Sequence, residues 1–310
     1  MLTRISVIAL NTYREAVRAR VLHGLFALAL VTAAYAMVVG EFALRSSMRV
    51  VSDLGAASVS IYAIVVAVVL GATSLHRELE LKTIFPILAR PIGRSEYLVG
   101  KYLGTLCTLL VFVMANAGVL LLALSAMSGR SPVAVACSLF GTMAVVSLAA
   151  WRMPRARSYA PIPWAAALGL LGWCLSTDAP DDRRVVVGAA VLAMAEVGII
   201  TAIATLFSSF SSPFLTAIFT FGLFIVGRSA DTLAHLPEHL FGSVIHGIAV
   251  GLSKVLPNLM LYVPPRSLLT GEAAGVSLGE YLALSLAHAL AWSVGLLALA
   301  SIIFKRRDFL

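Results

Sequence analysis

The chain has few charged residues. Only 12% of its 310 residues are Asp, Glu, Lys or Arg, whereas 60% are hydrophobic, and the mean hydropathy is +0.96. A chain of this size with so few polar side chains cannot cover the surface of a water-soluble globule. The sequence therefore predicts an integral membrane protein of the all-α class, a polytopic helix bundle that forms one domain over residues 1–310.

Motifs for several kinds of chemistry are also missing. A phosphate-binding loop needs G-x-x-x-x-G-K-[ST], and the nearest string, which ends in Gly100, Lys101 and Tyr102, lacks the first glycine and the final Ser or Thr. The patterns GxSxG and HExxH are absent as well. We therefore expect no catalytic residue and no bound cofactor or metal in this chain.

Cysteine and histidine give little sign of a metal or redox centre. His235, Glu238 and His239 have a spacing that could place ligands on one helical face, but Pro237 interrupts it, so an outward polar patch is favoured over a metal site. The cysteines have no CxxC spacing and lie in apolar runs, where we expect small core residues: Cys107, Cys137 and Cys174.

One stretch, residues 74–101, concentrates charge between two apolar runs. Residues 56–75 and 103–127 are each long enough to cross a hydrocarbon layer of ~30 Å. Between them, Glu78, Lys82 and Phe85 fall at helical spacing before Pro86 and Pro91 break the pattern. This predicts a short amphipathic helix, a turn and re-entry into the membrane, with an ordinary solvated loop as the alternative.

The amino-acid sequence of this stretch resembles that of a known protein family. The string RELELKTIFPILARPIGRSEYLVGKYLG resembles the first cytoplasmic loop of ABC transporter permeases of the ABC-2 export type, and among these the multicopper-enzyme-maturation permeases such as the nitrous-oxide-reductase accessory transporter. Lys82 departs from the pattern, which usually has glycine there. The positions that fall on the family pattern are Glu78, Glu80, Thr83, Pro91, Arg94, Gly100 and Lys101.

The resemblance implies a function and partners. In that family the loop is a coupling helix that docks on a separate ATPase subunit, so it implies two ATPase copies that bind ATP and Mg, a second permease copy in a homodimer, and a bacterial inner membrane. SSFSSP at 208–213 and LPNL at 256–259 are also similar to strings of this family. We therefore expect the membrane subunit of an ATP-driven exporter, and not an enzyme.

The remaining sequence predicts how the bundle is organised. Residues 1–20 have polar and apolar faces and resemble an interfacial elbow helix. Proline-interrupted residues 227–280 predict re-entrant or surface helices on the outer side. We expect eight spans, a six-span core plus an inserted hairpin at 133–176, at 21–39, 56–75, 102–127, 133–151, 161–176, 185–207, 214–226 and 281–304.

The distribution of basic residues predicts the orientation. With both termini in the cytoplasm, fifteen of the 23 Lys and Arg residues lie on the inner side, as the positive-inside rule requires. They are dispersed in short groups beside the spans, which argues against a nucleic-acid partner. The lipid bilayer is the expected surroundings of a multi-pass protein of this kind.

Glu196 is the one carboxylate deep inside a predicted span. A charge there is costly, so it is either a gate or cavity group, or a hydrogen-bonded residue that holds two helices together, for example through Asn116. Two alternative functions stay open. One is a membrane-embedded lipid-modifying enzyme that uses Glu196, His288 and the outer histidines. The other is a subunit that transports nothing and transmits ATPase motion to a periplasmic partner.

Overall fold

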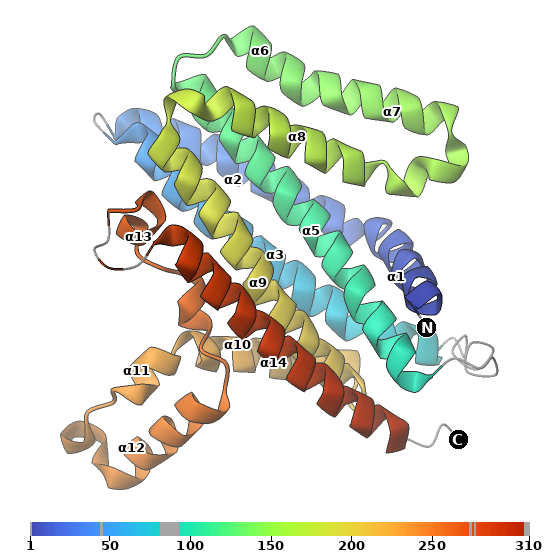
Figure 1. The fold of residues 1–310 in the computed structure, drawn as a ribbon, viewed down its shortest axis with the longest axis vertical. Coiled ribbons are helices and arrows are strands. Elements are labelled where there is room, and N and C mark those ends of the chain that lie inside the picture. Colours follow the sequence, from blue (N-terminus) through green and yellow to red (C-terminus); the bar gives the residue numbers. More distant parts are fainter. Residues whose placement is uncertain (1, 44–45, 81–92, 273–274, 276, 307–310) are drawn as a thin grey trace.

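A computed structural model describes residues 2–43, 46–80, 93–272, 275 and 277–306 of the chain, and all regular structure within them is helical. Figure 1 shows the arrangement. In chain order the elements are α1 (Leu2–Val17), α2 (Arg20–Phe42), α3 (Ser47–Glu80), α5 (Arg94–Met127), α6 (Pro132–Ala136), η1 (Cys137–Gly141), α7 (Thr142–Arg152), η2 (Pro154–Tyr159), α8 (Pro161–Leu175), η3 (Ser176–Asp178), α9 (Pro180–Ser208), α10 (Pro213–Arg228), α11 (Ala230–Ala234), α12 (Glu238–Val255), η4 (Leu259–Tyr262), α13 (Arg266–Thr270) and α14 (Leu278–Arg306).

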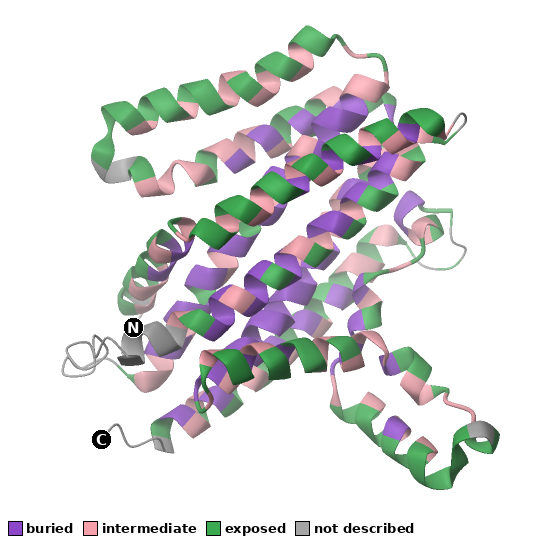
Figure 2. Cartoon of the chain, turned by 180° about the vertical axis from the view of Figure 1, so that it is seen from behind, coloured by how far each residue is buried: buried purple, intermediate pink, exposed green. Residues whose placement is uncertain are grey.

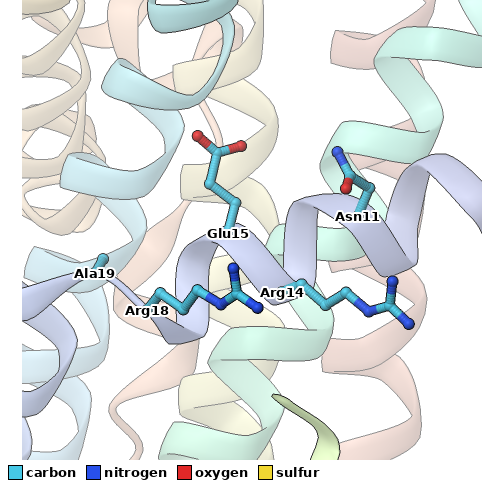
Figure 3. A pocket seen from close by; sticks show the side chains of 5 residues that line it. All are labelled: Asn11, Arg14, Glu15, Arg18 and Ala19. Atoms are coloured by element: carbon cyan, nitrogen blue, oxygen red, sulfur yellow. The ribbon is translucent and has the colours of Figure 1, made fainter. Parts of the chain in front are cut away.

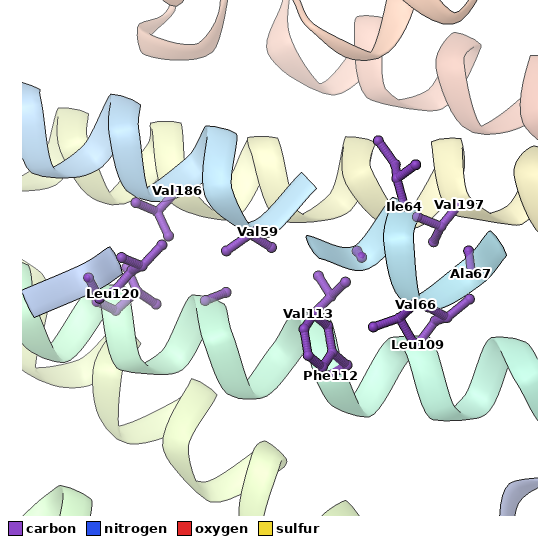
Figure 4. Close-up of a cluster of buried hydrophobic side chains, with 14 of the residues drawn as sticks. Val59, Ile64, Val66, Ala67, Leu109, Phe112, Val113, Leu120, Val186 and Val197 are labelled. Carbon is purple, nitrogen blue, oxygen red and sulfur yellow. The ribbon is translucent and has the colours of Figure 1, made fainter. Parts of the chain in front are cut away.

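Three long helices, α3, α5 and α9, form the centre of the bundle. Their facing sides hold a cluster of aliphatic side chains that includes Ile64, Leu109 and Val197 (Figure 4). Small residues let the backbones approach, since a Cβ atom on Gly71 of α3 would lie 2.5 Å from that of Ala204 on α9. Close van der Waals packing of this kind is what holds helices together in lipid, where apolar burial alone drives little.

The other helices surround this centre. α2 lies against α3, α14 against α9, and α1 against α5. The contact between α1 and α5 depends on two glycines. A Cβ atom on Gly104 would lie 2.4 Å from the carbonyl oxygen of Ala9, and one on Gly100 would lie 2.7 Å from Ile8. α1 is therefore seated directly on the backbone of α5.

Seven helices in the described part of the chain are long and apolar enough to cross a membrane. They coincide with seven of the eight predicted spans, and the protein is an all-helical, multi-pass membrane bundle. The eighth predicted span corresponds to α10, whose 16 residues reach about 24 Å at 1.5 Å per residue, less than the ~30 Å of hydrocarbon. The count of eight stays a prediction.

The predicted hairpin is a pair of antiparallel helical segments at the side of the bundle (Figure 1). α8 packs on α5, where the backbone of Leu168 lies 2.7 Å from the position of a Cβ atom on Gly118. In contrast, α6, η1 and α7 have no buried residue (Figure 2). The prediction that all three cysteines are core residues was wrong for Cys137 and Cys174, which are exposed, because an apolar run can face lipid as well as a core.

Residues 227–280 contain the short helices α11, α12 and α13 and the turn η4. α12 is interrupted at Gly242, which has φ 81°, a value that favours glycine. α11 and α12 project away from the long helices (Figure 1). Short helices were predicted here, and their place on the outer side stays a prediction.

Candidate functional site

Glu196 lies on α9, one of the central helices of the bundle, and its side chain is completely buried. Arg228, the last residue of α10, binds it with both ends of its guanidinium group: Nε donates to Oε1 at 2.8 Å and Nη2 to Oε2 at 2.8 Å. Ser60 of α3 donates to Oε2 at 3.2 Å. This two-pronged geometry is the strongest form of an Arg–carboxylate pair. The three residues join α3, α9 and α10 at one point.

The two charged groups of this pair differ in their access to solvent. The Arg228 side chain is 25% exposed, and its guanidinium carbon also lies 5.5 Å from the centre of the Phe224 ring, on the same helix. The carboxylate has no access to solvent and depends on its two partners for compensation. Separating α10 from α9 would therefore leave a buried negative charge, which is costly in a membrane. The arrangement acts as a latch between these helices.

The structure corrects the predicted partner of Glu196. The buried Asn116 donates from Nδ2 to the Phe112 carbonyl oxygen at 2.7 Å, one turn back on its own helix, and Arg228 takes the place expected for Asn116. An amide in lipid can satisfy itself within its helix, whereas a carboxylate needs a cation. The expectation that Glu196 links helices was right, but its partner was wrong.

A second polar cluster lies near the opposite end of α3 from Glu80. Arg266 of α13 binds Asp53 of α3 and Asp182 of α9, the latter from Nη2 at 2.5 Å. Ser52 donates to Asp182 at 2.7 Å. Burial lowers the pKa of Arg266, but the hydrogen bonds and charges of the two carboxylates outweigh this and raise the pKa overall. This cluster ties α13 to α3 and α9, two of the three helices that the latch joins.

The ends of α3 and α5 that flank residues 81–92 are held by further contacts. Lys101 is buried, and its Nζ donates to the Ser74 carbonyl oxygen of α3 at 2.9 Å. Arg94 Nη1 donates to two carbonyl oxygens of α14, that of Phe304 at 3.3 Å and that of Lys305 at 2.8 Å. These bonds connect α3, α5 and α14 near one end of the bundle.

The structure places the predicted coupling residues in three groups. Glu78 and Glu80 belong to the last turns of α3, whereas Thr83 and Pro91 lie outside the described residues. Arg94, Gly100 and Lys101 are part of α5 and contact α14, α1 and α3 within this chain. Residues 74–80 and 94–101 of this stretch belong to α3 and α5, where a loop with a separate short helix was predicted. The long helices continue past the ~30 Å needed to span the hydrocarbon layer.

Among the described residues, no hydrogen bond or ion pair joins a histidine to Glu196. His288 of α14 accepts or donates a bond with the Tyr262 hydroxyl at 2.8 Å through Nδ1, and His246 contacts the Leu236 carbonyl oxygen at 2.7 Å. Among the described residues there is no group of three or more His, Cys, Asp or Glu side chains that could hold a metal ion. Several charged groups of the bundle join helices, as Glu196, Arg94 and Lys101 do.

Two residues of the latch were not singled out from the sequence. Arg228 was counted only among the outer basic residues, and Ser60 was read as part of an apolar run. A signal for Arg228 was available, because a buried carboxylate requires a cation and Arg228 ends the helix that follows α9. Comparison with known proteins adds no assignment, since no family model and no curated protein matches this chain.

Proposed function

We propose that this chain is the membrane-spanning permease subunit of an ATP-driven exporter. It works as a homodimer with two copies of a separate ATPase, in a bacterial inner membrane, with both termini in the cytoplasm. The resemblance of the stretch around residues 78–104 to the coupling loop of ABC-2 permeases supports this, as does the lack of a phosphate-binding loop in the sequence. ATP and Mg are bound by the ATPase subunit.

The shape of α3 is the observation that carries the proposal. Its 34 residues reach about 51 Å, some 20 Å more than a hydrocarbon layer requires. One unbroken helix therefore runs from the Arg266 cluster through Ser60 to Glu80. Ser60 is about 30 Å from the Glu80 end. A displacement applied at residue 80 reaches the Glu196–Arg228 latch through a single rigid element.

Contacts with neighbouring helices couple a displacement of α3 to α5 and α14. Lys101 fixes α5 to α3, and Arg94 fixes α5 to α14, so three helices respond together to a force on the segment between α3 and α5. ATP binding closes the ATPase subunits, and the coupling segment passes this motion to the helices. Since Ser60 moves with α3, the motion changes the surroundings of Glu196 and alters how firmly α10 is held against α9.

Co-purification tests the proposal. The chain is purified from its native membrane, its partners are identified by mass spectrometry, and ATP hydrolysis is measured for the complex and for the chain alone. We expect an ATP-binding subunit at one copy per permease, with hydrolysis only in its presence. Glu80→Arg should weaken retention of that subunit by orders of magnitude, because truncating a charged interface contact costs roughly 2–5 kcal/mol.

A matched variant controls for the change of charge. Glu272→Arg makes the same substitution at an exposed residue just beyond α13 and should retain the ATPase subunit in full. Arg94 is unsuitable for this test because its guanidinium group also binds α14. The proposal fails if the purified chain has no ATP-binding partner, if it hydrolyses ATP by itself, or if Glu80→Arg and Glu272→Arg retain the ATPase equally.

A further inference from the structure

A hollow of ≈ 520 Å³ lies along α1, at the point where the chain turns into α2. It is lined by residues of the last turns of α1 and by the two residues that follow this helix: Asn11, Arg14, Glu15, Arg18 and Ala19 (Figure 3). The volume falls in the range of about 300–1,000 Å³ that is typical of small-molecule sites. The latch and the α3–α5 contacts make no use of this hollow.

The charge of the hollow is positive. No carboxylate pairs with Arg14 or Arg18 among the described residues. The Arg14 guanidinium carbon lies 4.8 Å from the centre of the Tyr159 ring, and Arg18 Nη2 donates to Ser158 Oγ at 3.2 Å. Each contact leaves other N–H groups of the guanidinium available for an anion. Glu15 projects in a different direction from the two arginines (Figure 3).

The turn η2 lies beside the hollow and is held against α1 by an aromatic contact. Tyr159 of η2 stacks on Tyr13 of α1 with ring centres 6.3 Å apart and planes 4° from parallel. Burial raises the pKa of Tyr13, with smaller contributions from Cys107 and Tyr159, so its phenol stays neutral. Arg157 of η2 is exposed beside these residues in the sequence and adds a further positive charge to this turn. Arg14 and Arg18 are thus held in place by η2 before any ligand arrives.

The hairpin shows where this region lies relative to the membrane. α7 is apolar and has no buried residue, and it ends at Trp151, which is 75% exposed, and Arg152. An exposed Trp followed by Arg is typical of the boundary between hydrocarbon and headgroups. η2 begins two residues later and contacts α1. The hollow is therefore at headgroup depth, where the anions within reach are lipid phosphates.

We propose that this hollow binds the phosphate-bearing headgroup of an anionic lipid, with Arg14 and Arg18 as its direct ligands. Basic pockets beside transmembrane helices recognise such headgroups through ionic hydrogen bonds. A bound lipid would join α1 to the hairpin, since Arg14 and Arg18 contact η2 as well. The proposal is independent of the exporter function, because it involves neither the ATPase nor the latch.

The experiment compares lipid retention by three forms of the full chain. The wild type, Arg14→Gln/Arg18→Gln and Arg49→Gln/Arg184→Gln are placed in nanodiscs of phosphatidylcholine, with and without phosphatidylglycerol, and retained lipids are counted by native mass spectrometry. Arg49 and Arg184 are exposed and paired with neighbouring carboxylates, so this control removes the same charge elsewhere. We expect the wild type and the control to retain phosphatidylglycerol over phosphatidylcholine, and the first variant to lose this preference roughly tenfold.

Several results would overturn the proposal: no preference in the wild type, an unchanged preference in Arg14→Gln/Arg18→Gln, or an equal loss in the control. Displacement of phosphatidylglycerol by inorganic phosphate would assign the hollow to the free ion and reject the lipid. If the glutamine variant does not elute as a folded protein, Arg14→Lys/Arg18→Lys replaces it. That variant keeps the charge but not the forked donors, so it should lose part of the preference, and full retention would contradict the assigned ligands.

Discussion

Replacing Arg228 by methionine should destabilise the protein in a way that depends on pH. The substitution removes both 2.8 Å bonds to a carboxylate that has no access to solvent. A buried charge left without its partner costs about 3–5 kcal/mol. Ser60 at 3.2 Å cannot compensate, since a single interhelical hydrogen bond in a membrane contributes only about 0.6 kcal/mol.

Protonation of Glu196 limits this cost. Adding a proton to an ordinary glutamate costs about 3.7 kcal/mol at pH 7 and about 1 kcal/mol at pH 5. The free energy of unfolding of the variant should therefore be lower than that of the wild type by up to about 3.7 kcal/mol at pH 7. This difference in stability should decrease as pH falls, because a neutral Glu196 carboxyl no longer needs the cation. At roughly 2–3 °C per kcal/mol for a chain of this size, the difference in Tm is about 7–11 °C at pH 7.

Thermal unfolding in detergent, followed by tryptophan fluorescence at both pH values, measures the difference. Glu196→Leu/Arg228→Met removes both charges and should recover most of the lost stability, since a buried pair can be replaced by apolar residues at little cost. The reasoning is refuted if Arg228→Met melts with the wild type at pH 7, or if the double variant is as unstable as the single one.

Three further predictions address the frame around the latch. Gly104→Leu should displace α1, because its Cβ atom would lie 2.4 Å from a carbonyl oxygen of that helix, and trypsin should then cleave α1 faster. Gly141→Leu, where a side chain would meet open space, should leave the cleavage rate unchanged. Equal cleavage of the two variants would argue against the close contact between α1 and α5. Lys101→Met removes a buried bond to α3 and should lower stability by about 1–3 kcal/mol, whereas an unchanged Tm would show that the bond is dispensable. In a chain without native cysteines, Arg155→Cys should react with a charged thiol reagent only from the cytoplasm and Asp181→Cys only from outside, and the reverse pattern would overturn the orientation.

The helical membrane bundle could be predicted from the sequence because hydropathy over twenty residues directly measures compatibility with lipid. The positions of seven helices follow from that measure alone. It could not show how far α3 and α5 extend beyond the membrane, since helix can continue through a charged segment such as 74–80. Nor could it separate core from lipid-facing surface, as Cys137 shows.

Of the two charged residues of the latch, only Glu196 was singled out from the sequence. Glu196 was singled out because a lone carboxylate in an apolar run is unusual. Its partner depends on the turn after α9 and on the direction of α10, which bring Arg228 back to the middle of α9. A distance of 32 residues along the chain contains no information about that return. The sequence indicates that Glu196 needs a cation, but the fold decides that this cation is Arg228.

The seat of α1 on α5 has a consequence for how the protein is made. Ile8 contacts Gly100, so about 90 residues separate α1 from its seat in the order of translation. At about 5–20 residues per second, a ribosome completes that seat roughly 5–20 s after α1 has left it. During this interval α1 lacks the helix against which it finally packs, and its exposed Val7 and Leu10 beside Arg14 and Arg18 would suit a membrane surface. The amphipathic face of α1 thus has a use in the nascent chain, before the helix it will finally contact exists.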